Sequence, residues 1–330
     1  MIFIGKAPYR VSLLGGSSDL DWFVKENNYG VCLGYSLDQY SYSVLNILPE
    51  SASKGLLEYS AREKYSNINE IVHPIVREAL LDFNISKFIE LKTFGFASGG
   101  SGLGGSASFI LSLISSLTKA FDIDINEKEI IEKACYLEIH KLKKSVGKQD
   151  QYLCAHPGFN SFSFYSNDNV KNNQISPLKL KILNRLSNDF YLIPTYRKRN
   201  SEVVLAQIKT DKDSVDKIIK IREIASDFLL FDDEREYKVE ELFHESIRES
   251  WNIKKSLSKV MTLNISEQYQ YIDRMIPNNW IRLIGAGGGG YFLISSKIKE
   301  DQIIKLSKEN GIKGIFKASV SNEGLNTFKI

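Results

Sequence analysis

The first hundred residues carry mainly strand-type hydrophobic patterns. A short apolar run fills residues 1–4, and residues 10–14 alternate in character before a glycine- and serine-rich turn. Aromatic and β-branched residues dominate residues 30–48 and again 88–96, so both stretches predict strands. Between them, residues 68–82 place apolar positions at helical spacing. The pattern therefore predicts a sheet whose strands are separated by one helix.

Two further helices are predicted next. Apolar side chains recur at mostly helical intervals through residues 106–121. Asn126 followed three residues later by Glu129 is a capping-box pattern, which begins a second helix that extends to about residue 146. Glu138 falls on the apolar stripe of this helix. Burying a carboxylate is costly unless it is paired or binds a metal, so we favour a cation-binding Glu138 over one that reaches water at the edge of the stripe.

The second half of the chain repeats the mixture of strand and helix patterns. Residues 159–173 predict a strand followed by a polar turn, and the pattern restarts near residue 189 with an apolar run. Charged helices follow to about residue 274, and a strand pattern over 281–295 is interrupted by a glycine run. We therefore predict an α+β chain with two domains, residues 1–185 and 186–330.

Composition indicates an ordinary soluble globular protein and is compatible with a small anionic ligand. The 43 basic and 40 acidic residues leave a formal charge of +3, too small a surplus to favour nucleic acid or an anionic membrane as partner. The three cysteines are scattered without a CxxC pair, which predicts neither a disulfide framework nor a thiolate zinc site. The longest apolar stretch, residues 109–117, is too short to span a bilayer. These features predict a cytoplasmic protein.

Residues 96–109, FASGGSGLGGSASF, place five glycines within seven residues just before a predicted helix. Glycines let the backbone approach a ligand and turn its N–H groups toward it, and the helix N-terminus adds a partial positive charge. Such a loop is suited to hold phosphate, although on its own a tight turn without a ligand is an equally open interpretation.

The same loop also matches a dinucleotide-binding pattern. Gly100, Gly102 and Gly105 satisfy GxGxxG, and Asp122 lies at the distance of a ribose-binding carboxylate. A Rossmann oxidoreductase is therefore one hypothesis. No clear second parallel strand separates Asp122 from the helix that begins at Asn126, which disfavours it.

The sequence GKQDQY at residues 147–152 places Lys148 and Asp150 near the end of the helix that carries Glu138. A carboxylate and a cation could meet a substrate here. Taken alone, such a tripeptide after a helix is more often a solvated loop.

Three separated stretches together resemble a known family: KAPYRVSLLGGSSDL at residues 6–20, GGSGLGGSAS at 99–108 and LIGAGGGGYF at 283–292. They are similar to the GHMP small-molecule kinases over nearly the whole chain. The resemblance implies a two-domain α+β fold with the active site in the cleft between the domains. It also implies ATP as phosphate donor, Mg²⁺ as cofactor and a small-molecule sugar phosphate as partner.

Within this family the motifs, with GKQDQY and the stretch LFHESIRESWNIKKSLS at 242–258, are most similar to kinases of D-glycero-D-manno-heptose 7-phosphate. This implies phosphorylation of the anomeric hydroxyl to the 1,7-bisphosphate, in nucleotide-activated heptose synthesis for surface polysaccharide. A galactokinase- or fucokinase-like specificity and, outside catalysis, a sugar or nucleotide sensor remain alternatives. The presence of both Glu138 and Asp150 disfavours the sensor.

The resemblance also implies site roles, because phosphoryl transfer needs positioning, charge neutralisation and a partner for the attacking hydroxyl's proton. Asp150 and Lys6 are the expected catalytic residues, and Ser106 and Glu138 the expected metal ligands. The expected ATP-binding residues are Gly99, Gly100, Ser101, Gly102, Leu103, Gly104, Gly105 and Ser106. The expected substrate-binding residues are Arg10, Gly15, Gly16, Ser17, Ser18, Asp19, Lys148, Gly287 and Gly288.

Overall fold

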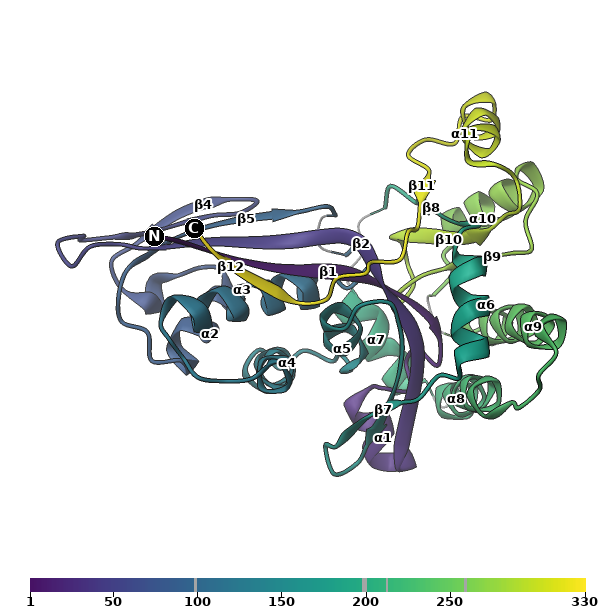
Figure 1. The fold of residues 1–330 in the computed structure, drawn as a ribbon, viewed down its shortest axis with the longest axis horizontal. Coiled ribbons are helices and arrows are strands. Elements are labelled where there is room, and N and C mark those ends of the chain that lie inside the picture. The colour runs from purple at the N-terminus through teal and green to yellow at the C-terminus, as the bar shows by residue number, and fades with distance from the viewer. Residues whose placement is uncertain (98–99, 198–200, 212, 258–259) are drawn as a thin grey trace.

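The computed structural model describes residues 1–97, 100–197, 201–211, 213–257 and 260–330. Two sheets organise these residues, and the chain is a mixed α+β structure, as predicted (Figure 1). The larger sheet has the strand order β12-β1-β2-β5-β3-β4, with β6 pairing to β2 and β7 to β6. Its strands are β1 (Ile2–Leu14), β2 (Tyr29–Ile47), β3 (Gly55–Glu58), β4 (Arg62–Tyr65), β5 (Ile89–Gly95), β6 (Phe159–Tyr165), β7 (Val170–Asn173) and β12 (Asn326–Lys329).

The long strands β1 and β2 pass through both parts of this sheet. They pair antiparallel along almost their whole length, with irregularities after Pro8 and after Ser12. Extra residues in one strand bend and twist a ladder locally. The two parts of β2 on either side of these irregularities have different second partners. Its residues from Ser41 onward pair with β5, and its residues up to Tyr35 pair with β6. The N-terminal strand predictions at 1–4 and 10–14 therefore belong to one continuous strand.

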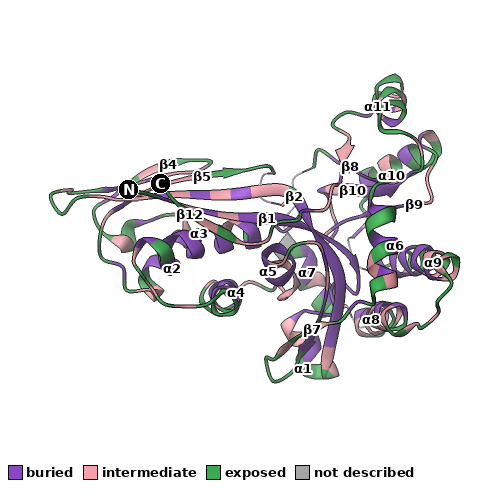
Figure 2. Ribbon diagram, in the orientation of Figure 1, coloured by how far each residue is buried: buried purple, intermediate pink, exposed green. Residues whose placement is uncertain are grey.

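Helices cover one face of the larger sheet (Figure 1). The central helix is α3 (Gly105–Ala120), which follows the glycine loop and packs against β1 and β2. Buried residues concentrate on α3 and on the parts of β1 and β2 that lie nearest the second sheet (Figure 2). The other helices of this half are α1 (Asp21–Asn27), the 3₁₀ turn Ile68–Glu70, α2 (Pro74–Asp82), α4 (Glu127–Tyr136), the π-helical turn Leu137–Lys141, α5 (Gln149–Ala155) and α6 (Pro177–Ser187).

Two predicted helices are shorter than their patterns indicated. The segment 68–82 divides into a 3₁₀ turn and α2, because Pro74 can begin a helix but cannot continue one from its N-terminal side. The helix capped by Asn126 has the expected capping box. It widens into the π-helical turn Leu137–Lys141 and ends at Leu142 rather than near residue 146.

The second sheet has the order β11-β8-β10-β9, with neighbouring strands antiparallel. The strand pattern predicted over 281–295 is interrupted at the glycine run, as expected, and forms two strands, β9 and β10, which this run connects as an antiparallel hairpin. The elements of this half are β8 (Phe190–Pro194), α7 (Ser201–Thr210), α8 (Ser214–Leu230), α9 (Glu236–Lys255), α10 (Leu263–Met275), β9 (Trp280–Leu283), β10 (Tyr291–Ser295), α11 (Glu300–Glu309) and β11 (Phe316–Lys317).

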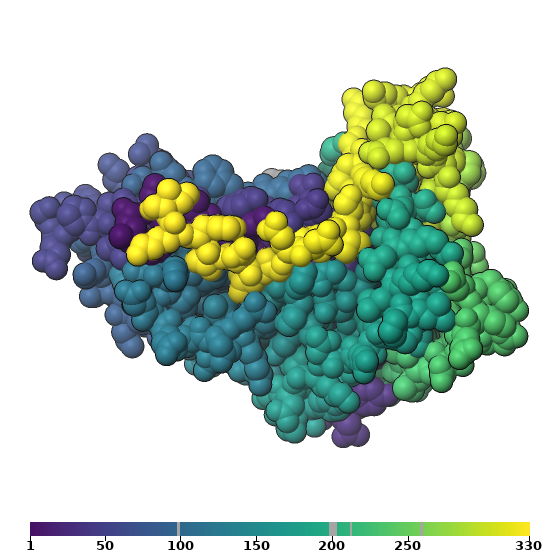
Figure 3. Space-filling model, viewed as in Figure 1, coloured from purple at the N-terminus to yellow at the C-terminus, as the bar shows by residue number. Residues whose placement is uncertain are grey.

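The end of the chain returns to the first sheet. After β11 the chain crosses back over the N-terminal half, and β12 pairs antiparallel with β1 (Figure 3). Without β12, β1 would present an unpaired edge. The boundary expected between residues 185 and 186 thus separates β12 from the sheet to which it belongs, a relation that sequence adjacency does not reveal.

The topology argues against the dinucleotide-binding hypothesis. The strand before the glycine loop, β5, is antiparallel to β2, and its parallel neighbour β3 precedes it in the chain. After the loop, α3 leads to α4 with no strand between them. A Rossmann unit needs a parallel strand at that point. Among the described helices, none is both long and apolar enough to cross a membrane.

The packing of α3 on β1 depends on Gly5. A methyl group at this position would lie 1.8 Å from the carbonyl oxygen of Ser112 in α3. Small buried side chains on the helix, such as Ser108, whose hydroxyl donates to the Ala7 carbonyl at 2.8 Å, complete this close approach. The helix that begins at the glycine loop is therefore held directly against β1.

We predict that Gly5→Ala lowers the free energy of unfolding by about 3 kcal/mol or more, because backbone must move to admit the methyl group. Chemical denaturation measures the change. Gly158→Ala is the control, since a methyl group there meets nothing within 4 Å, and its positive φ alone costs about 1–2 kcal/mol. Equal effects of the two substitutions would contradict the close approach of α3 to β1.

Candidate active site

The glycine loop is shaped by left-handed backbone at alternate residues. Gly100, Gly102 and Gly104 have φ values of 84°, 82° and 74°, a region that glycine enters without steric cost. Gly104 is also the N-cap of α3. Leu103 is fully buried, and its carbonyl accepts a 2.9 Å hydrogen bond from the backbone N–H of Arg10. The loop is thus fixed to β1 at the N-terminus of a sixteen-residue helix. The expected residue Gly99 lies outside the described residues.

The side chain of Arg10 joins this loop to the motif GKQDQY. Its Nε and Nη2 donate to the two carboxylate oxygens of Asp150 at 2.8 and 2.6 Å, and its Nη1 donates to the Gly102 carbonyl at 2.5 Å. Burial by itself would lower the pKa of the Arg10 guanidinium, but the adjacent Asp150 carboxylate outweighs burial and raises it. Arg10 therefore remains charged and holds Asp150 in a fixed orientation.

Asp150 lies in the first turn of the short helix α5, and not in a loop at the end of the preceding helix. About a third of its side chain, 32%, is exposed, whereas its partner Arg10 is 5% exposed. Both residues line the pocket in front of the glycine loop. The carboxylate of Asp150 is therefore the more accessible partner of the pair, and the buried Arg10 guanidinium fixes its orientation.

Asp19 contributes a second carboxylate to the same pocket. It accepts hydrogen bonds from the backbone N–H and the side-chain amide of Gln149, at 3.0 and 2.8 Å. Burial raises the pKa of Asp19 to about 6, and the nearby negative charge of Asp150 adds to this rise. Asp19 therefore changes its charge close to neutral pH. The neighbouring Ser17 also lines the pocket and has a φ of 84°, which is uncommon for a residue with a side chain.

Glu138 is buried, as its place on the apolar stripe predicted, and its carboxylate is the centre of a polar cluster. One oxygen accepts hydrogen bonds from the hydroxyl of Ser106 and from Lys144 Nζ, the latter at 2.9 Å. The other accepts from Gln151 Nε2 at 2.6 Å. The π-helical turn that carries Glu138 directs it toward the start of α3, where Ser106 lies.

The Ser106–Glu138 pair offers the donor set that Mg²⁺ prefers. Mg²⁺ takes oxygen ligands and is usually bound by one or two carboxylates together with substrate phosphates. The hydroxyl and the carboxylate touch each other, and the cationic Lys144 already contacts both. No group of three or more His, Cys, Asp or Glu suited to a metal occurs among the described residues. A metal here would therefore rest on this pair and on ligand oxygens.

The second half of the chain supplies the opposite wall of the pocket. Leu205, Lys254, Gly285 and Ala286 line it from α7, α9 and the β9–β10 connection. Gly290 lies so close to the glycine loop that a methyl group on it would be 2.2 Å from the Ser101 carbonyl oxygen. The two glycine-rich segments thus meet, and the pocket lies between the two halves of the chain.

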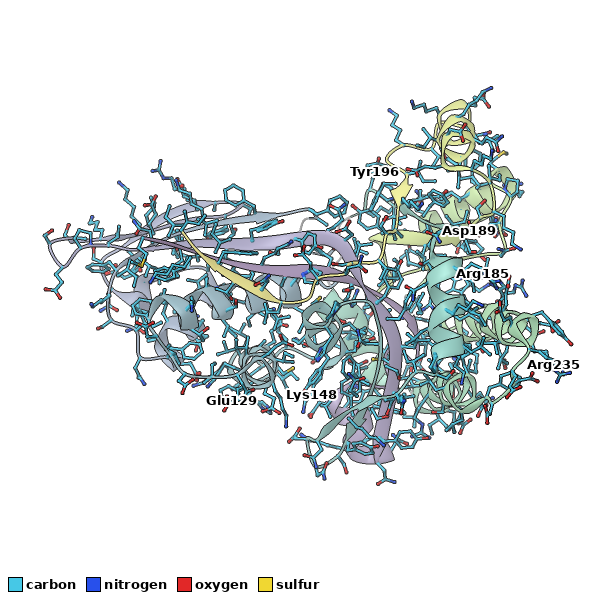
Figure 4. All side chains as sticks on the ribbon, in the orientation of Figure 1. Glu129, Lys148, Arg185, Asp189, Tyr196 and Arg235 are labelled. Carbon is cyan, nitrogen blue, oxygen red and sulfur yellow. The ribbon has the colours of Figure 1, made fainter. Side chains whose placement is uncertain are left out.

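Several expected site residues are not brought to this pocket. Lys6 donates to Glu323 at 2.6 Å and lies over the ring of Tyr40, so its predicted place at the reacting oxygens is not supported. Lys148 donates to Asp168 at 2.6 Å, beside the start of α5 (Figure 4). The other expected residues that are described but do not line the pocket are Gly15, Gly16, Ser18, Leu103, Gly287 and Gly288.

The physical reasons for these exclusions are local. The hydroxyl of Ser18 donates to the carbonyls of Gly15 and Val31, which closes the turn after β1. A methyl group on Gly15 would lie 1.9 Å from the Val31 carbonyl oxygen, and one on Gly287 would lie 2.6 Å from Val260 Cα. These positions serve close backbone packing. The side chains at Lys6 and Lys148 are already engaged by carboxylates outside the pocket.

Five polar or charged side chains line the pocket without having been among the expected site residues: Ser12, Lys144, Gln149, Gln151 and Lys254. Gln149 lies within GKQDQY, and Lys254 within the stretch at 242–258, so both had a motif to indicate them. Lys144 had no such signal. Its place depends on the π-helical turn and on the positive φ of 53° at Lys143, which reverses the chain after Leu142.

Comparisons with known proteins agree with this geometry. Residues 70–158 match the family model described as the GHMP kinases N terminal domain. The chain is 24% identical over 342 residues to a D-glycero-alpha-D-manno-heptose 7-phosphate kinase of Campylobacter jejuni, covering 98% of each. Residues 70–158 include the glycine loop, Glu138 and Asp150.

Solved structures share the fold along the full length. A D-glycero-D-manno-heptose 1-phosphate kinase from Bacteriodes thetaiotaomicron has a TM-score of 0.76 at 19% identity, covering 100% of this chain and 99% of its own. The galactokinase of Lactococcus lactis, complexed with galactose, has a TM-score of 0.68 at 15% identity, with coverage of 100% and 95%. A mevalonate kinase has a TM-score of 0.70 at 18% identity, with coverage of 97% and 99%.

The family model covers the glycine loop, Glu138 and Asp150, and the relatives match over almost the full length of the chain. The resemblance stated from the three sequence motifs is thereby confirmed. The chain thus contains a match to the GHMP kinases N terminal domain and is similar along its full length to kinases of small molecules, which indicates an ATP-dependent small-molecule kinase.

Proposed function

We propose that this protein transfers a phosphoryl group from ATP to a hydroxyl of a sugar that already carries a phosphate. The observation that carries the proposal is the arrangement of one pocket, in which the glycine loop faces the Arg10-held carboxylate of Asp150. A phosphate donor and an attacking hydroxyl can meet between these groups. Such transfer depends mainly on positioning and charge stabilisation, and little on covalent chemistry by the protein.

In this proposal the backbone from Gly100 to Ser106 binds the phosphates of ATP at the N-terminus of α3, where the N–H groups and the helix dipole favour an anion. Ser106 and Glu138 would hold Mg²⁺, which neutralises charge on phosphate oxygens when it is bound. Gly290 supports the loop from the opposite side at the Ser101 carbonyl. These contacts keep the phosphate-binding backbone in place before ATP arrives.

Asp150 accepts or orients the proton of the attacking sugar hydroxyl. A catalytic carboxylate must be held in position, and the two hydrogen bonds from Arg10 do this while the exposed third of the side chain faces the pocket. Asp19, Ser17 and the amide of Gln149 lie beside it and offer acceptors and donors to sugar hydroxyls.

The finer proposal concerns the sugar. The motifs and two of the relatives favour a heptose phosphate, and we propose D-glycero-D-manno-heptose 7-phosphate, phosphorylated at its anomeric hydroxyl to give the 1,7-bisphosphate for nucleotide-activated heptose. One relative is named for the 7-phosphate and the other for the 1-phosphate, so the position of transfer needs direct measurement. Galactokinase- and fucokinase-like specificities are the alternatives, and galactose and fucose carry no phosphate.

Lys254 is our candidate for holding the phosphate that the substrate already carries. It lines the pocket from α9, on the wall that faces the glycine loop, and is only 5% exposed. Lys254, a cation of the second half of the chain, can therefore bind a phosphate on the substrate.

The deciding experiment is an ADP-release screen with ATP and matched pairs of free and phosphorylated sugars, with the product position read by phosphorus NMR. We expect turnover with heptose 7-phosphate and a new anomeric phosphate signal. Faster turnover on the free sugars than on their phosphates would refute the sugar-phosphate proposal. If no ADP is released with either class of sugar, the sugar-kinase proposal is wrong.

We predict that Asp150→Asn reduces turnover roughly 10²–10⁴-fold, because an amide cannot accept the hydroxyl proton. Turnover is measured beside ATP and sugar binding by calorimetry, and both affinities should remain. Asp168→Asn is the control, since Asp168 pairs with Lys148 outside the pocket. Near-normal turnover in Asp150→Asn would assign the catalytic role to another carboxylate, with Asp19 the first to test.

We predict that sugar affinity rises roughly fivefold as pH increases from about 5 to 7. Because the pKa of Asp19 is raised to about 6, its carboxyl is neutral below this pH and charged above it. A charged acceptor contributes about 1 kcal/mol more per hydrogen bond than a neutral one. Calorimetry with wild type and Asp19→Asn measures this, and the rise should be about fivefold smaller in the variant, because the substrate phosphate titrates in both proteins alike. A step of equal size in both proteins would assign it to another group.

We predict that Lys254→Met raises the KM for the phosphorylated sugar roughly tenfold or more, because it removes a charge-assisted contact to phosphate. The KM for ATP and the slow turnover of the free sugar should be unchanged. Lys255→Met is the matched control on the same helix, where Lys255 lies over the rings of Trp251 and Tyr269. An equal loss with free and phosphorylated sugar would contradict this role.

A further inference from the structure

Lys144 contacts both members of the Ser106–Glu138 pair, the proposed metal ligands. Its Nζ lies 2.9 Å from Glu138 Oε1 and 3.2 Å from Ser106 Oγ. Its backbone N–H also donates to the Glu138 carbonyl at 3.0 Å. The lysine is thus tied to Glu138 by both its backbone and its side chain, and it completes the charge balance of a buried carboxylate.

The same contacts imply competition. The hydroxyl of Ser106 donates a hydrogen bond to Glu138 Oε1, and the ammonium group of Lys144 contacts the Ser106 hydroxyl oxygen and the same Glu138 oxygen. To present lone pairs to a divalent cation, the pair must give up these hydrogen bonds. A singly charged resident cation and a doubly charged incoming one therefore cannot share these two oxygens without strong repulsion.

The total charge of the pocket supports this view. Its lining includes three cationic side chains, Arg10, Lys144 and Lys254, and three carboxylates, Asp19, Glu138 and Asp150. A metal ion that entered alone would add uncompensated positive charge. A nucleotide that entered with it would supply phosphate oxygens next to Lys144, because the lysine and the loop residues Gly104 to Ser106 line the same pocket.

We propose that Lys144 is the counter-ion of the Ser106–Glu138 pair when no nucleotide is bound. When a divalent cation and a nucleotide bind, the cation takes its place on the pair and the ammonium group of Lys144 moves to the phosphate oxygens of the nucleotide. This rests on the proposed function in so far as the second anion is a nucleotide. The long flexible stem of lysine permits such an exchange, whereas a rigid guanidinium fork would not. Its consequence is that metal and nucleotide each strengthen the binding of the other.

The test measures metal binding without turnover. Mn²⁺ is titrated into nucleotide-free protein and into protein saturated with a non-hydrolysable ATP analogue, and free Mn²⁺ is followed by its electron paramagnetic resonance signal. Wild type should bind Mn²⁺ weakly when alone and much more tightly with the analogue. Lys144→Met should bind Mn²⁺ on the order of tenfold more tightly when alone, because the competing charge is gone.

The same variant should bind the analogue less tightly, so that the coupling between Mn²⁺ and nucleotide falls by a similar factor. Lys141→Met is the matched control, because Lys141 is a nearby cation that lies toward Asp82 and away from the pair. It should behave as wild type. Glu138→Gln should bind Mn²⁺ more weakly in both states.

Each possible result of these titrations tests one part of the proposal. If nucleotide-free Lys144→Met binds Mn²⁺ no more tightly than wild type, Lys144 does not compete for the pair and the inference is wrong. If it binds Mn²⁺ more tightly but binds the analogue as wild type does, the transfer to phosphate is wrong. If wild type binds no ATP analogue at all, the proposed kinase function fails, and the nucleotide-free titration still reports on the competition.

Discussion

The buried guanidinium of Arg10 is the interaction on which the rest of the site depends. It binds the two oxygens of Asp150 and the Gly102 carbonyl, while its own backbone N–H binds the Leu103 carbonyl. A buried charge must be satisfied by partners in fixed positions. One strand, one loop and one short helix, far apart in the sequence, are therefore fixed relative to one another.

Each of the three carboxylates in the pocket is also held by hydrogen bonds, and the chemical type of the partner differs from one carboxylate to the next. Asp150 has a guanidinium, Asp19 has the amides of Gln149, and Glu138 has a hydroxyl, an amide and an ammonium group. Only the amide-bound carboxylate lacks a full counter-charge, and it is the one whose pKa is raised to about 6. The partners therefore give three similar side chains different properties within one pocket.

Sequence patterns predicted the parts of this arrangement that depend on local periodicity and on contiguous motifs. They located the glycine loop, α3, the capped helix α4 and the buried position of Glu138. They did not locate Lys144, because its side chain is directed by a π-helical turn and a positive φ that have no clear sequence signature. They also placed Lys6 in the site, because a motif gives the position of a residue in the chain but not the carboxylate, Glu323, to which its side chain turns.

The pairing of β12 with β1 has a consequence for how the protein is made. During synthesis the first strand leaves the ribosome long before its outer neighbour, since the whole second half of the chain lies between Leu14 and Asn326. The early sheet must therefore persist with one open side, which can pair wrongly with other chains. The side chain of Lys6, at one end of this junction on β1, is a charge of the kind that opposes such contacts while the partner strand is absent.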